Sequence, residues 1–106
     1  MEQPTFYEKR NVFETAENYN NGIVNFFMDV DGYECYVLKQ HGLHDFRHEN
    51  DAHDELLFVA QGSATIELND ETIQLATGDM LKIPRGVIHA NIIAHHAILI
   101  LFEMKG

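Results

Sequence analysis

The chain has 106 residues, a formal net charge of −10 and 45% apolar residues, a composition typical of one folded domain rather than a disordered segment. Seven basic residues against seventeen acidic ones argue against a nucleic-acid partner, because a phosphate backbone repels an acidic surface. The longest apolar run, residues 97–102, is too short to span a membrane. A single cysteine, Cys35, excludes an internal disulfide, and the start of the chain lacks a secretory signal pattern, so we expect a cytoplasmic protein.

The N-terminal residues 1–22 are polar with scattered aromatic anchors, and their sequence leaves open a short strand or one or two helical turns. From residue 23 onward, β-branched and aromatic residues alternate with turn residues, which is typical of short strands. Hairpin turns are predicted at Asp31-Gly32 and at residues 69–71. The predicted strands cover residues 23–30, 33–40, 56–60, 64–68, 72–75, 80–83, 87–93 and 97–102.

Short strands at regular spacing, joined by Gly, Asp and Pro, predict an all-β fold, an antiparallel sandwich or barrel. We expect residues 23–106 to form this single domain, and residues 1–22 to be an N-terminal extension that packs on it or on a partner subunit. The segments 55–60 and 97–102 are apolar on both faces of their strands, although a barrel strand can show one face to water. We therefore expect a covering layer, and we favour a homodimer.

Histidine is frequent in this chain, with seven copies. His41 and His44 flank Gly42 and are predicted on a surface loop, and His95-His96 is predicted as a hairpin turn. The remaining histidines have carboxylate or amide side chains close by in the sequence. This candidate set consists of His48, His53 and His89, with Asn50 and Glu55.

The spacing within the candidate set has structural consequences. His48 and Asn50 are two residues apart and share one face of a strand, whereas Glu55 lies at an odd offset from His48. Residues 51–54 must therefore form a loop or bulge if Glu55 is to face the same way. His89 follows a predicted type I turn at residues 83–86. Two imidazoles and one carboxylate form a ligand set for Fe, Mn, Ni or Zn.

These residues resemble the two sequence motifs of the cupin family. The first motif is matched by Gly42, His48, Asn50, Glu55 and Gly62, with Asn50 where a histidine is usual. The second is matched by Gly78, Pro84, Gly86 and His89, with Ile93 where an asparagine is usual. The resemblance implies a jelly-roll β-barrel, often dimeric, that binds a metal inside. It assigns the metal ligands to His48, Asn50, Glu55 and His89.

Asn50 is the departure that matters for function, because an amide oxygen is a weaker ligand than imidazole for these metals. Three outcomes stay open. In the first, the metal is held by a two-histidine, one-carboxylate triad of His48, Glu55 and His89 alone. In the second, Asn50 adds a weak contact, or His53 takes its place. In the third, the metal is lost and the site binds a small polar ligand instead.

Two functions follow from these outcomes. The first is a metal-dependent enzyme, an oxygenase, isomerase or lyase, acting on a small polar metabolite at an open metal position. The second is a non-catalytic metabolite-binding or sensor barrel with a weakened or lost metal site. No catalytic residue is assigned. The side chains expected to shape the interior are Phe46, Phe58 and Met80, and the nearest candidates for a general base are Tyr36, Gln40 and Arg47.

Overall fold

The protein is described by a computed structural model that covers residues 7–49 and 53–104; the side chains of residues 45–49 and of Asn91 lie outside this description. One short helix precedes six strands. In chain order the elements are α1 (Val12–Ala16), β1 (Val24–Val30), β2 (Tyr33–Glu49), β3 (Glu55–Leu68), β4 (Glu71–Ala76), β5 (Met80–Ile83) and β6 (Ile88–Met104).

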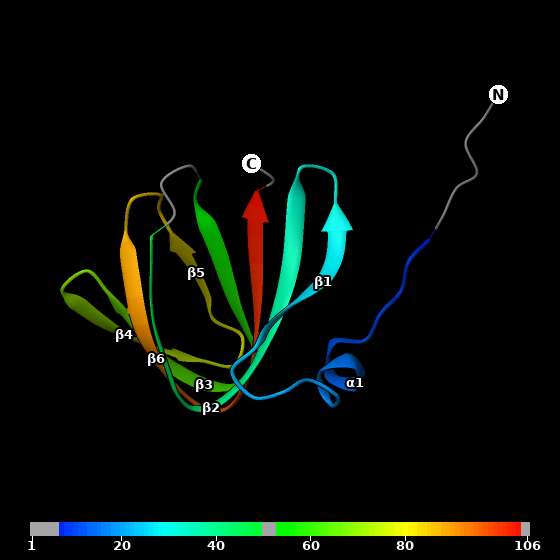
Figure 1. The fold of residues 1–106 in the computed structure, drawn as a ribbon, viewed down its shortest axis with the longest axis horizontal. Coiled ribbons are helices and arrows are strands. Elements are labelled where there is room, and N and C mark those ends of the chain that lie inside the picture. The colour runs from blue at the N-terminus through cyan, green and yellow to red at the C-terminus, as the bar shows by residue number, and fades with distance from the viewer. Residues whose placement is uncertain (1–6, 50–52, 105–106) are drawn as a thin grey trace.

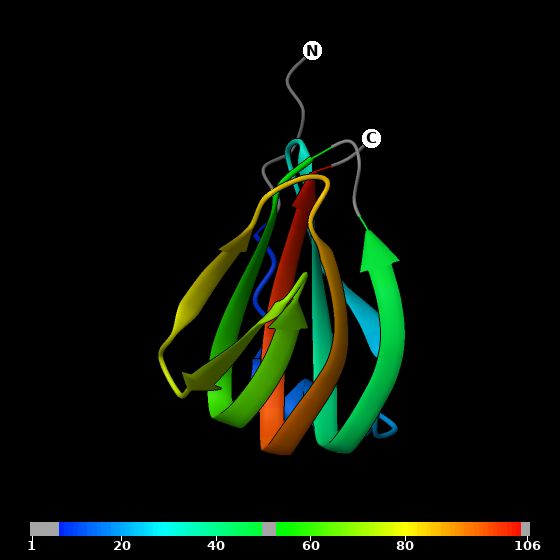
Figure 2. The same ribbon diagram turned by 90° about the vertical axis from the view of Figure 1, so that its left-hand side faces the viewer.

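All strand pairs are antiparallel, in the order β1-β2-β6-β3-β4, with β5 paired to β3. The three long strands β2, β3 and β6 bend near their middles, so the sheet folds into two arms (Figures 1 and 2). The first arm contains β1, β5, the first halves of β2 and β3 and the second half of β6. The second arm contains β4 and the other halves of the long strands. This bent sheet confirms the predicted all-β jelly-roll class, although the sheet is not closed into a complete barrel.

The bends lie where the sequence predicted strand ends. The pairing register shifts between Gln40 and Gly42 in β2 and around Gln61 and Ser63 in β3. Predictions of a break at residues 61–62 and of a turn at His95-His96 are wrong, because β3 and β6 continue through both places. A bulge bends a strand with the same glycine and polar residues that end one, so local sequence does not distinguish the two.

The main hydrophobic core fills the space between the two arms. Its buried members include Leu57 and Val59 of β3 and Leu99 of β6. The neighbouring positions of β3 are less buried, and its burial alternates along residues 55–60. Successive residues of each strand therefore face either this interior or the outside of the sheet.

A second, smaller core lies on the outside of the first arm, beneath α1. Ala16 of the helix packs there with Phe27, Cys35 and Ile98. The helix is started by Asn11, whose side chain accepts hydrogen bonds from the backbone N–H groups of residues 13 and 14. In the described part of the extension, the alternative of a helical turn is therefore the one observed, and Cys35 is a small core residue. Within residues 7–49 and 53–104, no helix is long and apolar enough to cross a membrane.

Candidate functional site

Among the described residues, Glu55 and His89 are polar residues that are buried on the same cavity. Glu55 begins β3 and His89 is the second residue of β6. Only 2% and 3% of these residues is exposed, and both border one interior cavity of about 440 Å³. Burying a carboxylate is costly unless a cation or hydrogen-bond donors compensate for it, so this cavity is the candidate site.

The other residues of the predicted ligand set are placed only in part. The register of β2 and β6 puts the backbone of His48 directly opposite His89. The His48 side chain lies outside the described part of the structure, as do the side chains of Phe46 and Arg47, and Asn50 lies outside the described residues altogether. Within the described part, no three His, Cys, Asp or Glu side chains form a group that could hold a metal ion. The four-residue ligand set therefore remains a prediction.

His44 is a further histidine in the wall of the same cavity. The prediction that His41 and His44 lie on a loop is wrong, because both are within β2. His41 is exposed, whereas His44 is half-buried. Gly42, with φ at +93°, bends the strand without ending it. The remaining described residues of the wall are Val24, Tyr36, Leu101 and Glu103.

Tyr36 supplies a phenolic hydroxyl to this wall. Its ring contacts Phe26 edge to face, with 5.9 Å between the ring centroids and 81° between the ring planes. Burial raises the pKa of Tyr36 above its usual value, and Glu34 and Glu103 raise it further through their charges and a hydrogen bond from the hydroxyl to Glu34. Tyr36 is therefore a neutral hydrogen-bond donor at physiological pH, and not the general base that the sequence left open.

Gln40 lies deeper in the interior and is 1% exposed. Its Nε2 donates to the carbonyl oxygen of Gly42 at 2.9 Å, across the bend of β2. A Cβ atom added to Gly22 would lie 3.2 Å from Gln40 Oε1 and 3.6 Å from His44 Nδ1. The backbone before β1 therefore packs closely on these two side chains, and Gln40 stabilises the bend.

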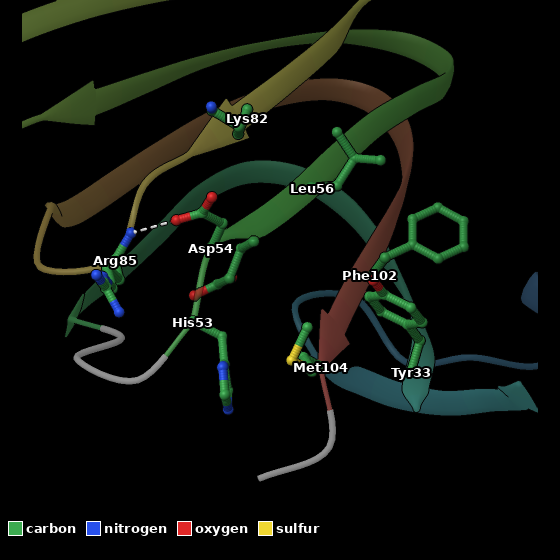
Figure 3. Close-up of a pocket in the computed structure, with 9 residues that line it drawn as sticks. Tyr33, His53, Asp54, Leu56, Lys82, Arg85, Phe102 and Met104 are labelled. Carbon is green, nitrogen blue, oxygen red and sulfur yellow. Dashed lines mark hydrogen bonds between the residues drawn. The ribbon is translucent and has the colours of Figure 1, made fainter. Parts of the chain in front are cut away.

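A larger hollow, of about 790 Å³, lies on the outer face of the first arm (Figure 3). His53 and Asp54 border it, and Asp54 accepts a hydrogen bond from the backbone N–H of Arg85 at 3.0 Å. His53 therefore lies at the outer hollow, and it is not among the described residues of the interior cavity wall. Glu55 borders both the hollow and the cavity. The apolar residues that line the outer hollow are Tyr33, Leu56, Phe102 and Met104.

The expectation that Phe58 and Met80 shape the interior is wrong. Met80 is 59% exposed and pairs with Phe58 across β5 and β3. Phe58 alternates with the buried Leu57 and Val59, so it faces outward. These positions belong to the outer face of the first arm.

Three histidines meet at the bend rather than at the cavity. The rings of His41 and His96 stack with 4.1 Å between centroids, and His95 contacts His41 edge to face. The backbone N–H of His96 donates to His41 Nδ1 at 3.1 Å. These contacts join β2 to β6 where both strands change direction, so their role is structural.

Comparison with known proteins identifies the class. The family model described as "Cupin domain" matches residues 35–104, and the chain therefore belongs to the cupin-domain family. The matched segment contains His48, Glu55 and His89. A search of the curated proteins found no match.

Solved structures agree with this assignment. A cupin-2 domain containing protein from Shewanella frigidimarina is 24% identical, with a TM-score of 0.79 over 91% of this chain and 94% of that one. A putative mannose-6-phosphate isomerase from Ralstonia eutropha is 17% identical, with a TM-score of 0.73 over 94% and 100% of the two chains. A hydroquinone 1,2-dioxygenase solved with Cd²⁺ and 4-hydroxybenzonitrile is 18% identical, with a TM-score of 0.75 over 99% and 82%. At these identities the similarity establishes the fold.

Proposed function

We propose that this cupin domain binds a divalent transition metal through His48, Glu55 and His89, and that it acts on a small polar molecule at an open metal position. The observation that carries this proposal is the burial of Glu55 and His89 on one interior cavity. The register of His48 opposite His89 adds support from the neighbouring strand. Asn50 is a weak fourth donor in this proposal.

The donor types fit the metal. Imidazole nitrogen and carboxylate oxygen are ligands that Fe, Mn, Ni and Zn share, and a site with three protein ligands leaves positions for a small molecule. A metal held there would polarise a carbonyl or carboxylate, or activate water or dioxygen. The Tyr36 hydroxyl, which donates to Glu34, would accept a hydrogen bond from the ligand at the cavity wall, and Leu101 would exclude water beside it.

The named neighbours support metal-dependent chemistry without selecting a reaction. One is a hydroquinone 1,2-dioxygenase solved with Cd²⁺ and a phenol, and another is a putative sugar-phosphate isomerase. Because one fold hosts such different reactions, the choice between oxygenase, isomerase and lyase rests on the site itself. The metal identity is likewise part of the test below.

A second candidate function is a metal-free barrel that binds a small polar molecule without turnover. The observation that favours it is Asn50 in place of the usual histidine, because an amide oxygen is a weaker ligand than imidazole for these metals. This alternative predicts stabilisation of the metal-free protein by a ligand, measured as a rise in Tm.

The metal content of untagged protein, purified without chelator or nickel resin, tests the first proposal. We expect about one transition metal per chain by plasma mass spectrometry, as purified or after loading with Fe(II), Mn(II), Ni(II) or Zn(II). His89→Gln should lose this metal because it removes a buried ligand. The matched control is His95→Gln, an exposed histidine at the bend.

Far-UV circular dichroism of both variants establishes that they fold. Equal metal in wild type and in folded His89→Gln would refute the ligand assignment, and His48→Ala provides the same test for the facing strand. Absence of metal from wild type after every loading would favour the metal-free barrel.

We also propose that the outer face of the first arm joins two copies of the chain. The apolar outer patch consists of Tyr33, Leu56, Phe58, Met80 and Met104, of which Tyr33, Met80 and Met104 are 47%, 59% and 43% exposed. The α1 helix covers the neighbouring part of this face and leaves the patch open. A second copy would bury it, which is the usual fate of a large exposed apolar patch.

Sedimentation equilibrium tests the dimer. Wild type should sediment as a dimer and Met80→Glu as a monomer, whereas Leu43→Glu, which is equally exposed in the second arm, should remain dimeric. A monomeric wild type at high micromolar concentration would refute this proposal.

The domain boundaries and location complete the proposal. We infer that residues 23–106 form one domain, with residues 1–22 as an extension; the packing of Ala16 on Cys35 and Ile98 supports an extension that packs on the domain. A cytoplasmic location is supported by the free thiol of buried Cys35.

A further inference from the structure

The interior face of the first arm changes from polar to apolar over three successive rows of residues. Directly opposed residues of an antiparallel sheet stand on the same face, so the register defines these rows. The row farthest from the bends consists of Glu34, Glu103 and Glu55. The next row toward the bends consists of Phe26, Tyr36, Leu101 and Leu57, and the one after it of Val24, Leu38, Leu99 and Val59. All three rows contribute to the cavity wall, so this side of the cavity is polar at one end and apolar at the other.

The second arm contributes one histidine to each end of the cavity. His89 is the second residue of β6, far from the bend of that strand, and so lies at the polar end. His44 is two residues past Gly42, where β2 bends. An added Cβ atom on Gly22, two residues before Val24, would lie 3.6 Å from His44 Nδ1. His44 therefore borders the apolar end, opposite Val24.

Tyr36 places an aromatic ring between the two ends of the cavity. Phe26 contacts this ring edge to face, with 5.9 Å between the centroids, and the Tyr36 hydroxyl donates to Glu34. Both contacts hold the ring in position before a ligand binds. A second ring that packs on Tyr36 gains an aromatic contact beyond the area it buries, whereas a saturated ring of the same size gains the area alone.

Apolar side chains line the opening of this cavity beside β1, the strand with which the strand order begins. Val24 and Phe26 share the interior face with Tyr36, yet they are 48% and 52% exposed. Exposed apolar side chains at the rim of a cavity are typical of a ligand-binding groove. The cavity volume of about 440 Å³ lies within the range of pockets that hold one small organic molecule.

We propose that the ligand of this cavity carries an aromatic ring with a polar substituent, and that the Tyr36 ring selects for it. This inference rests on the proposed function for its site and adds the class of the ligand. The aromatic ring packs on Val24, Tyr36 and Leu101, and its substituent points to the polar end. A sugar of the same size is disfavoured, because its hydroxyl groups would be buried without partners against the apolar end.

Phenol and cyclohexanol are matched probes for this selection, because both are uncharged at neutral pH and have one hydroxyl and the same number of non-hydrogen atoms. Their Kd values are measured by NMR titration of metal-free protein labelled at leucine and valine methyl groups. Leu101 and Val24 report binding in the cavity, whereas Leu56 reports binding at the outer hollow in the same sample. Intermolecular NOEs from the phenol ring protons to Leu101 and Val24 locate the probe in wild type.

Phenol should bind in the cavity about two- to tenfold more tightly than cyclohexanol, the factor that one aromatic contact supplies. Tyr36→Phe retains the ring and should keep the ratio of the two Kd values, whereas Tyr36→Leu should bring it close to one. Comparing ratios between variants cancels the difference between the two probes in water. Tyr33→Leu is the matched control, because it makes the same change at the outer hollow and should leave the ratio unchanged. Tyr36→Met removes the ring as well, should Tyr36→Leu fail to fold.

Cyclohexanol that binds as tightly as phenol would overturn the inference, and so would a ratio that survives loss of the Tyr36 ring. Phenol that shifts Leu56 but neither Leu101 nor Val24 would also overturn it, because the ring would then bind at the outer hollow. These titrations need no metal, so their result is separate from the metal content. Ring selection in a protein that takes up no metal would refute the metal proposal alone. A protein that takes up metal but does not select the ring would refute this inference alone.

Discussion

Replacing Gly62 with alanine tests how the bend of β3 holds the two arms in place. Gly62 has φ at +79°, in the left-handed region that favours glycine. An added Cβ atom would lie 2.5 Å from the carbonyl oxygens of both His95 and His96, and 2.8 Å from the carbonyl carbon of His96. These are backbone atoms of the bend in β6, so relief requires one strand to move away from the other.

Two terms contribute to the cost. Placing a residue with a Cβ in the left-handed region costs about 1–2 kcal/mol. Forcing extra volume into a packed contact costs about 1–3 kcal/mol more, giving about 2–5 kcal/mol in all. Gly78→Ala separates the terms, because Gly78 has φ at +94° but no atom within 4 Å of an added Cβ. It should cost only the conformational term, about 1–2 kcal/mol.

Urea unfolding followed by far-UV circular dichroism measures both variants. The free energy of unfolding should fall further in Gly62→Ala than in Gly78→Ala, with the slope against urea unchanged. If Gly62→Ala costs no more than Gly78→Ala, then β3 and β6 do not approach as closely at the bend as the structure has them. The account of the bend as a fixed corner would then be wrong.

Three further predictions concern the core, the helix and the cavity. Leu99→Ala, at a position that is 0% exposed, should lower the free energy of unfolding in urea by about 2–5 kcal/mol, and a loss under 1 kcal/mol would contradict its place in the core. Asn11→Ala should cost about 1 kcal/mol in the same assay, because it removes the cap of α1; an unchanged midpoint would mean that the cap does not stabilise the fold. Burial, with the charges of Glu34 and Glu103, raises the pKa of Tyr36 above 10.0, so the unfolded chain loses its phenolic proton first as pH rises. Stability should therefore fall as pH rises above 10.0, and Tyr36→Phe should reduce that fall; an identical alkaline profile in the variant would count against the raised pKa.

The β-branched and aromatic segments between turn residues predicted most of the strands. Their inward faces were less well determined at residues 55–60, which are apolar on both faces: Leu57 and Val59 are buried between the arms, whereas Phe58, expected in the interior, faces outward. Turns could also be predicted from the sequence where a hydrogen bond to one side chain fixes them. Asp79 accepts a hydrogen bond from the backbone N–H of Ala76 at 2.8 Å, as its position after Gly78 predicts.

The bends were not predictable in the same way. Gly62 and His95-His96 have the local features of turns, but the ladder between β3 and β6 resumes on the other side of each. Pairing between distant segments decides whether such a sequence ends a strand or bends it. For the same reason the sequence did not predict that His44 lies in the cavity wall. Its position there depends on β2 continuing past Gly42.

The cupin motifs and the cavity wall differ in what they determine. The motifs point to Glu55 and His89, the proposed metal donors, because each motif is local to one segment of the chain. Tyr36 and Glu103 belong to neither motif, and only the pairing of β2 with β6 brings them to the same cavity. Donor groups of this kind are shared by metal sites with different substrates, whereas the charge and hydrogen-bond donors around them determine which molecule is bound. Under the proposed function, ligand specificity should therefore respond most to substitutions of Tyr36 and Glu103, and metal content to substitutions of Glu55 and His89.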